Sequence, residues 1–271
     1  ALNAAFVDIG DEKEAFVHYL DLGLYFEAFD EFVRRINPNT DAKGIYKHIR
    51  PGKILEKEGR IENVLKPGQM IIVQIVKEPI STKGSRLTAE ISLAGRNIVL
   101  LPFAEKVSVS QKISSKEEKR RLETLVRSIL PKNYGAIIRT AAEGKNAAIL
   151  DAELMSLIDK WENSWKKLAK SKGVQLLFTE YSKTTTILRD LLNDSFTNIY
   201  VNDETIYEET RKYISLISPE QEKIVKLYKE KAPIFDHFEV TRQIKSSFGK
   251  VVPIKQGAYL VIEHTEALHV I

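Results

Sequence analysis

Hydrophobic and polar residues alternate at the start of the chain. In AAFVDIG one parity is apolar throughout, and Phe6 and Asp8 occupy the other parity. A second alternating run, EAFVHYL, follows the turn GDEKE and places Phe16 and His18 opposite its apolar parity. Alternation with a period of two is typical of β-strands that bury one face. The pattern therefore predicts two strands that expose Phe6, Phe16 and His18 on one side.

Short strands and turns continue to about residue 94. The Pro- and Gly-containing stretches INPNTDAKG and RPGK predict a linking segment. KPGQMIIVQIVKE then predicts a turn that leads into a buried strand, and STKGSRLTAEISLAG predicts a further strand pair, with Lys83 in its turn. Several short strands separated by turns favour a small β-barrel.

The pattern changes at about Gly95 to a mixture of helix and strand. Ser115 and Glu118 match a capping box, and apolar residues follow at helical spacing until a proline ends the helix. The strand GAIIRT comes next, followed by a longer helix whose apolar stripe includes Trp161 and Trp165. We interpret both tryptophans as core residues and not as part of a ligand site.

Strands and helices alternate in the last third of the chain. The patterns predict, in order, the strand VQLLFTE, the helix TTTILRDLL, the strand FTNIYVN, the helix DETIYEETRKYISLI, a strand near KIVKLYK and the helix IFDHFEVTRQIKSSFGK, which stops at Gly249. This order is typical of an α/β unit. The final KVVPIKQGAYLVIEHTEALHVI predicts a hairpin around QG.

Composition narrows the class of protein. The 271 residues are 43% hydrophobic and 29% charged, which favours a globular chain with two or more domains. The chain has no cysteine, and its five histidines show no zinc-ligand spacing. No run approaches the about 20 apolar residues of a membrane span, so we expect a cytoplasmic protein. The net charge of +4 permits a polyanionic partner without requiring one.

The residues of the predicted barrel allow two interpretations. Phe6 and Phe16, with His18, could stack on unpaired bases at about 1 to 3 kcal/mol per base. The alternative is that the two phenylalanines are core residues. Lys83 could contact a backbone phosphate, or it could be a solvated turn lysine.

Arg139 and Thr140 end the apolar strand GAIIRT, ahead of a small-residue run and a helix. A guanidinium, a hydroxyl and nearby backbone N–H groups would form an anion site. The alternative is an arginine that pairs with a surface carboxylate. The basic runs KEEKRRLE and KKLAKSK are interpreted as solvated helix faces. The sequence has no Gly-rich phosphate loop, HExxH or G-x-S-x-G motif, so the pattern alone predicts no catalytic residue.

Four segments, in this order, together resemble the bacterial ribonuclease E/G family: AAFVDIGDEKEAFVHYL, TKGSRLTAEISLAGRNIVLLP, GAIIRTAAEGK and GAYLVIEHTEALHVI. The resemblance covers essentially the whole chain and implies an α+β multidomain protein. Residues 1–94 would form an OB-fold RNA-binding barrel that lacks its first strand, and residues 95–183 a mixed α/β sensor of the RNA 5′ end. Residues 184–247 would form a ribonuclease H-like domain, and residues 248–271 the first hairpin of a deoxyribonuclease-like catalytic subdomain.

The resemblance also implies residue roles. The positions that match RNA-contacting positions of the family's barrel are Phe6, Phe16, His18 and Lys83. The positions that match the family's 5′-monophosphate pocket are Gly95, Val99, Arg139 and Thr140. In that pocket the arginine and the threonine would hold the phosphate, and the strand before them would support the terminal base. A basic family position near Ser110, Gln111 and Lys112 is not clearly kept.

The resemblance places the catalytic aspartates, which bind magnesium in the family, after the motif TEALHVI. We therefore expect no catalytic or metal-binding residue and no bound cofactor in this chain, which we interpret as a fragment. Magnesium and homo-oligomer formation would belong to the complete enzyme.

The expected function is the RNA-binding and 5′-monophosphate-sensing part of an endoribonuclease that cleaves single-stranded RNA in RNA processing and decay. The alternatives are a non-catalytic OB-fold RNA-binding module, such as a ribosome or assembly factor, and a protein-interaction fragment without RNA affinity. Salt-sensitive RNA binding would exclude the second alternative.

Overall fold

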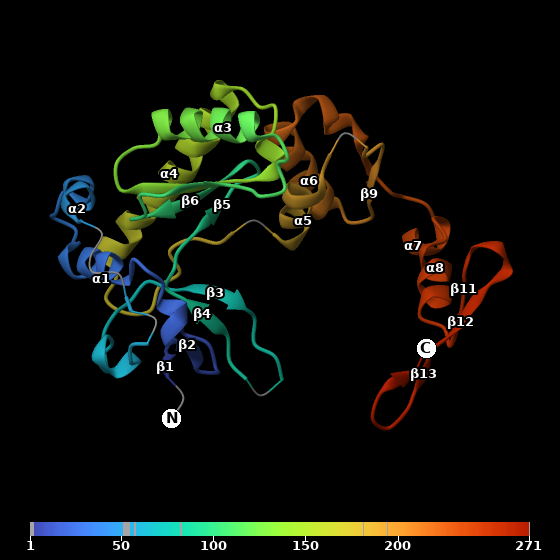
Figure 1. Ribbon diagram of the computed structural model, residues 1–271, viewed down its shortest axis with the longest axis horizontal. Coiled ribbons are helices and arrows are strands. Elements are labelled where there is room, and N and C mark those ends of the chain that lie inside the picture. The colour runs from blue at the N-terminus through green and yellow to red at the C-terminus, as the bar shows by residue number, and fades with distance from the viewer. Residues whose placement is uncertain are drawn as a thin grey trace. The chain divides into compact units, whose positions relative to one another are not determined.

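The structure is a computed structural model that describes residues 3–50, 55–56, 58–81, 83–180, 182–193 and 195–270. The chain forms two compact units, Ala1–Glu180 and Tyr181–Ile271 (Figure 1). Both units mix helices and strands, and the described strands form several separate sheets, which confirms the mixed α and β class. Among the described residues, no helix is long and apolar enough to cross a membrane.

The first sheet has the strand order β1-β2-β4-β3. Its strands are β1 (Ala4–Val7), β2 (Ala15–His18), β3 (Gln74–Lys77) and β4 (Arg86–Thr88). β2 pairs with β1 in antiparallel and with β4 in parallel fashion, and β3 is antiparallel to β4. Among the described strands, β1 and β3 each pair with one neighbour, so the described sheet is open.

Two predicted strands are confirmed and a third is corrected. Ala15 and Val17 of β2 are fully buried, whereas Phe16 between them is half-buried, as the alternation predicts. The prediction of a buried strand in KPGQMIIVQIVKE was wrong, because Ile75 and Val76 of β3 are 52% and 54% exposed. β3 lies at the edge of the described sheet, where no described strand pairs with its outer side.

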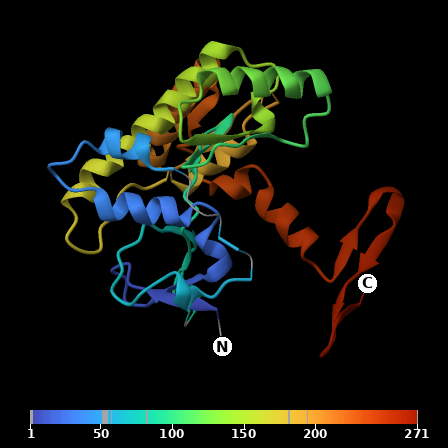
Figure 2. The same ribbon diagram turned by 60° about the vertical axis from the view of Figure 1, so that its left-hand side comes forward.

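The second sheet has the order β5-β6-β8-β7. Its strands are β5 (Leu93–Ala94), β6 (Ile98–Pro102), β7 (Val107–Val109) and β8 (Tyr134–Ile138). Figures 1 and 2 show α3 (Lys116–Ile129) and α4 (Ala147–Lys170) on the same face of this sheet. Ser115 Oγ accepts the Glu118 N–H at 3.2 Å, which confirms the predicted cap. Trp161 and Trp165 are buried, as predicted.

Two further helices, α1 (Phe26–Arg35) and α2 (Ala42–His48), lie where the sequence analysis predicts no helix. Phe29 and Phe32 of α1 pack edge-on against Phe103 in the same core as both tryptophans. The predicted linker INPNTDAKG ends inside α2, and most of RPGK lies outside the described residues. The spacing of the aromatic residues at positions 26, 29 and 32 is typical of one face of a helix and could have predicted α1.

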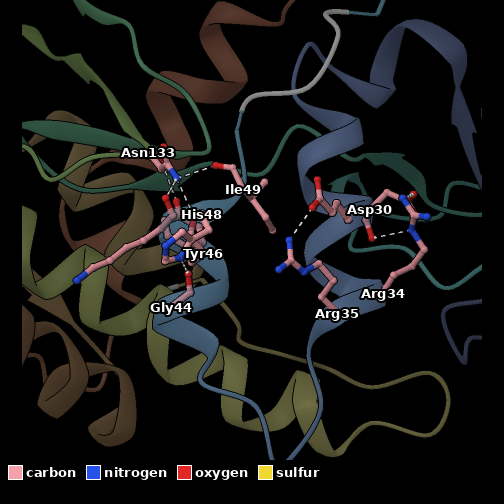
Figure 3. Close-up of polar contacts among 10 residues, drawn as sticks. Asp30, Arg34, Arg35, Gly44, Tyr46, His48, Ile49 and Asn133 are labelled. Carbon is pink, nitrogen blue, oxygen red and sulfur yellow. Dashed lines mark hydrogen bonds and ion pairs between the residues drawn. The ribbon is translucent and has the colours of Figure 1, made fainter.

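Asn133 ties α2 to the turn before β8 (Figure 3). Its Nδ2 donates to Tyr46 O at 2.7 Å and to Ile49 O at 2.9 Å, and the Tyr46 hydroxyl donates back to Asn133 O at 2.8 Å. The same hydroxyl accepts the Phe103 N–H at 3.1 Å. Asn133 has a φ of 66°, a left-handed conformation that asparagine tolerates better than most residues. This network holds α2 against the turn before β8 and against the backbone at Phe103.

Residues 174–180 form no strand in the structure, so the strand predicted for VQLLFTE was wrong. Leu177 and Phe178 instead pack against the core that contains α4. Their apolar side chains are covered by this helical core, without a strand pairing, and an apolar run by itself does not separate the two outcomes.

The second unit contains a parallel strand pair with a helical crossover. β9 (Ile199–Val201) pairs in parallel with β10 (Val225–Leu227), and α6 (Glu204–Ile217) and the 3₁₀ helix η4 (Pro219–Ile224) connect them. α5 (Lys183–Leu191) packs on α6 around a core that includes Leu188 and Ile214. These elements confirm the predicted alternation.

The chain from residue 234 onward differs in part from the prediction. One helix was predicted, but α7 (Ile234–His237) and α8 (Val240–Ser247) are separated by Phe238 and Glu239, and the φ of Glu239 is 56°. The break leaves the Phe238 ring stacked on Tyr200, with centroids 4.6 Å apart.

The predicted hairpin is confirmed as β11 (Val251–Pro253) and β12 (Tyr259–Val261), with the 3₁₀ helix η5 (Lys255–Gly257) between them. A second, smaller hairpin follows, formed by β13 (Glu263–His264) and β14 (His269–Val270). The remaining 3₁₀ helices are η1 (Tyr19–Leu22), η2 (Ile61–Asn63) and η3 (Thr140–Ala142). The domain boundaries at 94/95, 183/184 and 247/248 stay predictions.

Candidate nucleic-acid interface

The outer face of the first sheet carries a row of aromatic and cationic residues. Phe6 lies directly opposite Phe16, Phe16 is the partner of Arg86, and Arg86 is the partner of Lys77. Phe6 is 75% exposed, so it is not a core residue of the described fold. We call these four residues the strand row. Two ring surfaces beside two cations can stack on bases and attract the phosphates between them.

Arg86 and Lys77 were not singled out in the sequence. Arg86 lies opposite Phe16, so its side chain is on the same face of the sheet as the exposed parity of β2. The sequence could have indicated this residue only if the order of the strands had been known. Asp21 holds the Arg86 guanidinium with two hydrogen bonds of 3.1 and 3.0 Å. This bidentate pair keeps the guanidinium in one position.

His18 lies next to the strand row, opposite Ala4 on β1. Its Nδ1 accepts the Leu20 N–H at 3.2 Å, which caps the following 3₁₀ helix. The neutral imidazole must then carry its proton on Nε2, the other ring nitrogen.

Lys83 is exposed in a turn closed by two backbone hydrogen bonds with Ile80, of 3.2 and 3.0 Å. A Cβ on Gly84 would overlap Glu14 O, so the chain enters β4 in close contact with β2. Lys83 therefore lies near the beginning of β2, in the turn three residues before Arg86 of β4.

The four residues predicted by resemblance to form a phosphate pocket lie at one end of the β6–β8 pair. Arg139 follows β8, and its Nη1 donates to Gly95 O at 2.8 Å. Its backbone N–H donates to Asn97 O at 2.8 Å. Val99 of β6 lies opposite Ile137 of β8 on the sheet face away from the buried row. Arg139 is thereby anchored beside an apolar strand surface.

Thr140 begins η3 and faces a hydroxyl that was not predicted as part of the site. Its Oγ1 lies 3.0 Å from Ser110 Oγ, and Ser110 Oγ accepts the Lys112 N–H at 3.3 Å. Ser110 N donates to Ile138 O at 2.8 Å, which places this loop beside the end of β8. Two hydroxyls thus lie together at the residue that directly follows Arg139 in the chain, and the pair retains one O–H that can donate to an anion.

The loop after Thr140 is fastened to α3. The Glu118 carboxylate accepts the Gly144 N–H at 2.8 Å and two Arg121 N–H groups at 2.6 and 2.7 Å. Arg121 Nη2 also donates to Lys145 O at 3.0 Å. Hydrogen bonds from Arg121 and then from Gly144 lower the pKa of Glu118 from 4.5 to about 2.

Glu118→Gln is expected to lower the melting temperature at pH 7. The lowered pKa means that the carboxylate stabilises the fold above about pH 4.5, and this contribution is lost as pH falls through about 2. The difference in melting temperature between wild type and variant should therefore shrink between these pH values, which thermal unfolding monitored by circular dichroism can follow.

Glu123→Gln is the matched control for Glu118→Gln. Glu123 pairs with Arg127 on the same helix at 2.8 Å, as an exposed pair within one helix. A smaller effect is expected because the control removes an ion pair without releasing the loop. A difference for Glu118→Gln that stays constant across the pH range would contradict the assigned role.

Taken together, these features define a mixed α and β protein with an exposed aromatic and cationic sheet face and a separate cluster of anion-donor groups. The chain matches the ribonuclease E/G family over residues 92–271. It is 34% identical to ribonuclease G of Haemophilus influenzae over 269 residues, which cover 98% of this chain and 50% of that protein. It has the same identity to ribonuclease G of Escherichia coli K12, with 98% and 51% covered.

A ribonuclease E of Nostoc sp. is 30% identical over 274 residues, which cover 100% of this chain and 36% of that protein. The chain belongs to the ribonuclease E/G family. It spans about half the length of the ribonuclease G relatives.

Proposed function

We propose that this chain is the RNA-binding and 5′-monophosphate-sensing part of an endoribonuclease that cleaves single-stranded RNA. The observations that carry the proposal are the anchoring of Arg139 by Gly95 O and the pairing of the Ser110 hydroxyl with that of Thr140, the residue after Arg139. The similarity to proteins named ribonuclease G and ribonuclease E supports RNA as the ligand.

The proposed recognition uses groups that suit a terminal phosphate. A 5′ monophosphate carries about −1.5 to −2 charges near neutral pH, whereas a 5′ hydroxyl carries none. The Arg139 guanidinium would supply charge and a planar pair of donors, and Thr140 and Ser110 would supply hydroxyl donors. The half-buried Val99 and the exposed Ile137 offer an apolar surface for the terminal base.

The finer fold assignment is part of this proposal. We assign the first sheet to an OB-type RNA-binding domain and the second sheet with α3 and α4 to the 5′-end sensor. The parallel pair β9–β10 with its helical crossover supports a ribonuclease H-like α/β domain, and the hairpin β11–β12 would begin the catalytic subdomain.

The magnesium of the proposed complete enzyme does not fit the residues described here. Among them, no three His, Asp or Glu side chains lie close enough together to hold a metal ion. No step of the cleavage reaction is therefore assigned to this chain. For the complete enzyme we propose a cytoplasmic homo-oligomer.

A pair of RNAs tests the proposal. Two identical short single-stranded RNAs, one with a 5′ monophosphate and one with a 5′ hydroxyl, are titrated with the chain and followed by fluorescence anisotropy. Tighter binding of the phosphorylated RNA is expected. Equal, salt-sensitive binding of both would favour the non-catalytic RNA-binding module, since phosphate contacts along the strand release counterions regardless of the 5′ end.

Phe6→Ala is expected to weaken binding of both RNAs equally. Loss of one stacked base corresponds to about 1 to 3 kcal/mol, or roughly 5- to 150-fold in the dissociation constant. The ratio between the two RNAs should not change, because Phe6 lies on the first sheet and the anion cluster on the second.

Ile75→Ala is the control for Phe6→Ala. Ile75 is an exposed apolar residue of the same sheet, but it is the partner of the buried Leu87 and so belongs to the other parity. An equal loss of affinity in both variants would show that binding does not depend on the strand row.

A further inference from the structure

A single carboxylate holds the turn between β5 and β6. Glu153 of α4 accepts the backbone N–H of Asn97 with both oxygens, at 3.1 and 3.0 Å, and it also accepts the backbone N–H of Arg96. Gly95 N donates to Ile98 O at 2.8 Å, which closes the same turn. We call residues 95–97 the sensor turn.

The sensor turn fits closely around the Glu153 carboxylate. A Cβ at Gly95 would overlap Glu153 Oε1 and would come within 2.8 Å of Ile98 O. Glycine is therefore favoured at position 95 by the backbone oxygen of Ile98, and a larger residue would also displace the carboxylate. This gives a physical reason for a residue that the sequence analysis selected only by resemblance.

Arg139 contacts the sensor turn at two points. Its guanidinium donates to Gly95 O, and its backbone N–H donates to Asn97 O. The N–H groups of the turn thus donate to the carboxylate of Glu153 on α4. Its carbonyl groups accept hydrogen bonds from Arg139 at the end of β8. The position of Gly95 O, which fixes the guanidinium, depends on the contact made by Glu153.

We propose that Glu153 is a positioning residue for the 5′-phosphate site, which holds the sensor turn so that Gly95 O orients the Arg139 guanidinium toward the ligand. The inference rests on the proposed function and adds a residue to it. Nothing in the strand spacing singles out Glu153, because it lies 14 positions beyond Arg139, inside a long helix.

The charge on Glu153 is held in an unfavourable environment. Burial raises the pKa of Glu153, and the contacts with Asn97 and Arg96 and the charge of Arg139 oppose that rise. Arg139 is the charged side chain of the described chain whose attraction favours the ionised Glu153 carboxylate, whereas Arg96 contacts Glu153 through its backbone N–H. A proton on Glu153 would remove its charge and one acceptor, and would loosen the turn that orients the guanidinium.

The test measures the phosphate preference, defined as the dissociation constant of the 5′-hydroxyl RNA divided by that of the 5′-monophosphate RNA. Glu153→Gln is expected to lower this ratio several-fold while the hydroxyl RNA binds as in wild type. In a variant that also carries Arg139→Ala, the change at Glu153 should cause no further loss. Asp151→Asn, a carboxylate on a different face of α4, is the matched control and should keep the wild-type ratio.

The pH dependence of the phosphate preference is a second measurement, which separates the proposed role of the Glu153 charge from a role in folding alone. As pH falls from about 8 toward the raised pKa of Glu153, the ratio in wild type should decrease more than in Glu153→Gln, because only wild type takes up a proton at position 153, whereas the phosphate's own second ionisation affects both proteins alike. If Glu153→Gln does not fold, the wild-type profile is compared with the titration of the RNA 5′ phosphate followed by ³¹P NMR. Coincident profiles would then overturn the inference.

The failures of the two proposals are distinguishable. A wild-type ratio near one would overturn the proposed sensing function, and the role of Glu153 with it. A wild-type ratio above one that Arg139→Ala abolishes and Glu153→Gln leaves intact, with the same pH profile, would overturn only the role of Glu153.

Discussion

Asn133→Ala is expected to lower the free energy of unfolding of the first unit by about 3 kcal/mol. Asn133 is buried, and its Nδ2 donates to Tyr46 O and Ile49 O at 2.7 and 2.9 Å. Each hydrogen bond contributes about 1 kcal/mol, and alanine would leave both carbonyls without this donor. Alanine also tolerates the φ of 66° less well than asparagine, at a cost of about 1 kcal/mol.

Two further substitutions separate the contributions. Asn133→Gly removes the side-chain donors but adopts a positive φ without steric cost, so about 2 kcal/mol should be lost. Asn133→Asp places a carboxylate against two carbonyl oxygens and should destabilise more than alanine. Urea unfolding at pH 7 gives all three values. Wild-type stability in Asn133→Gly would assign the whole effect to the backbone, and wild-type stability in Asn133→Ala would contradict both contributions.

The parts of the fold that sequence patterning predicted are those with a local cause. Alternation fixed the parity of β2 because one face of that strand is fully buried, and the cap at Ser115 marked the start of α3. Trp161 and Trp165 were placed in the core by helical spacing, which their burial confirms.

The parts that patterning missed depend on distant partners. Whether Leu177 and Phe178 join a strand or cover a helical core is decided by neighbours that the local pattern does not contain. The break at Glu239 likewise accompanies the packing of Phe238 on Tyr200, 38 residues away in the chain. Local periodicity carries no information on either contact.

The candidate site shows the same division. The resemblance selected Gly95, Val99, Arg139 and Thr140, and the structure brings them together, although their part in phosphate binding stays a proposal. Sequence reasoning did not find Ser110 or Glu153. Ser110 meets Thr140 across 30 residues and Glu153 meets Asn97 across 56, so only the fold pairs them.

Arg139→Ala is expected to abolish the preference for a 5′-monophosphate RNA. Charge-assisted hydrogen bonds contribute about 1.5 to 3 kcal/mol, so the phosphorylated RNA should bind roughly 10- to 150-fold more weakly. Binding of the hydroxyl RNA should change little, because the strand row is on the other sheet. Arg139→Lys keeps the charge but not the planar fork that Gly95 O orients, so an intermediate preference is expected.

Arg120→Ala controls for the loss of one positive charge in the Arg139 experiment. Arg120 is exposed on α3, in the run KEEKRRLE that was interpreted as a solvated helix face. If general attraction to RNA were responsible, Arg120→Ala and Arg139→Ala would lower the affinity for both RNAs to a similar degree. The two variants would then show the same ratio of dissociation constants for the two RNAs. A loss confined to Arg139→Ala and to the phosphorylated RNA assigns the effect to one oriented guanidinium, because a diffuse field would be weakened by the loss of either arginine.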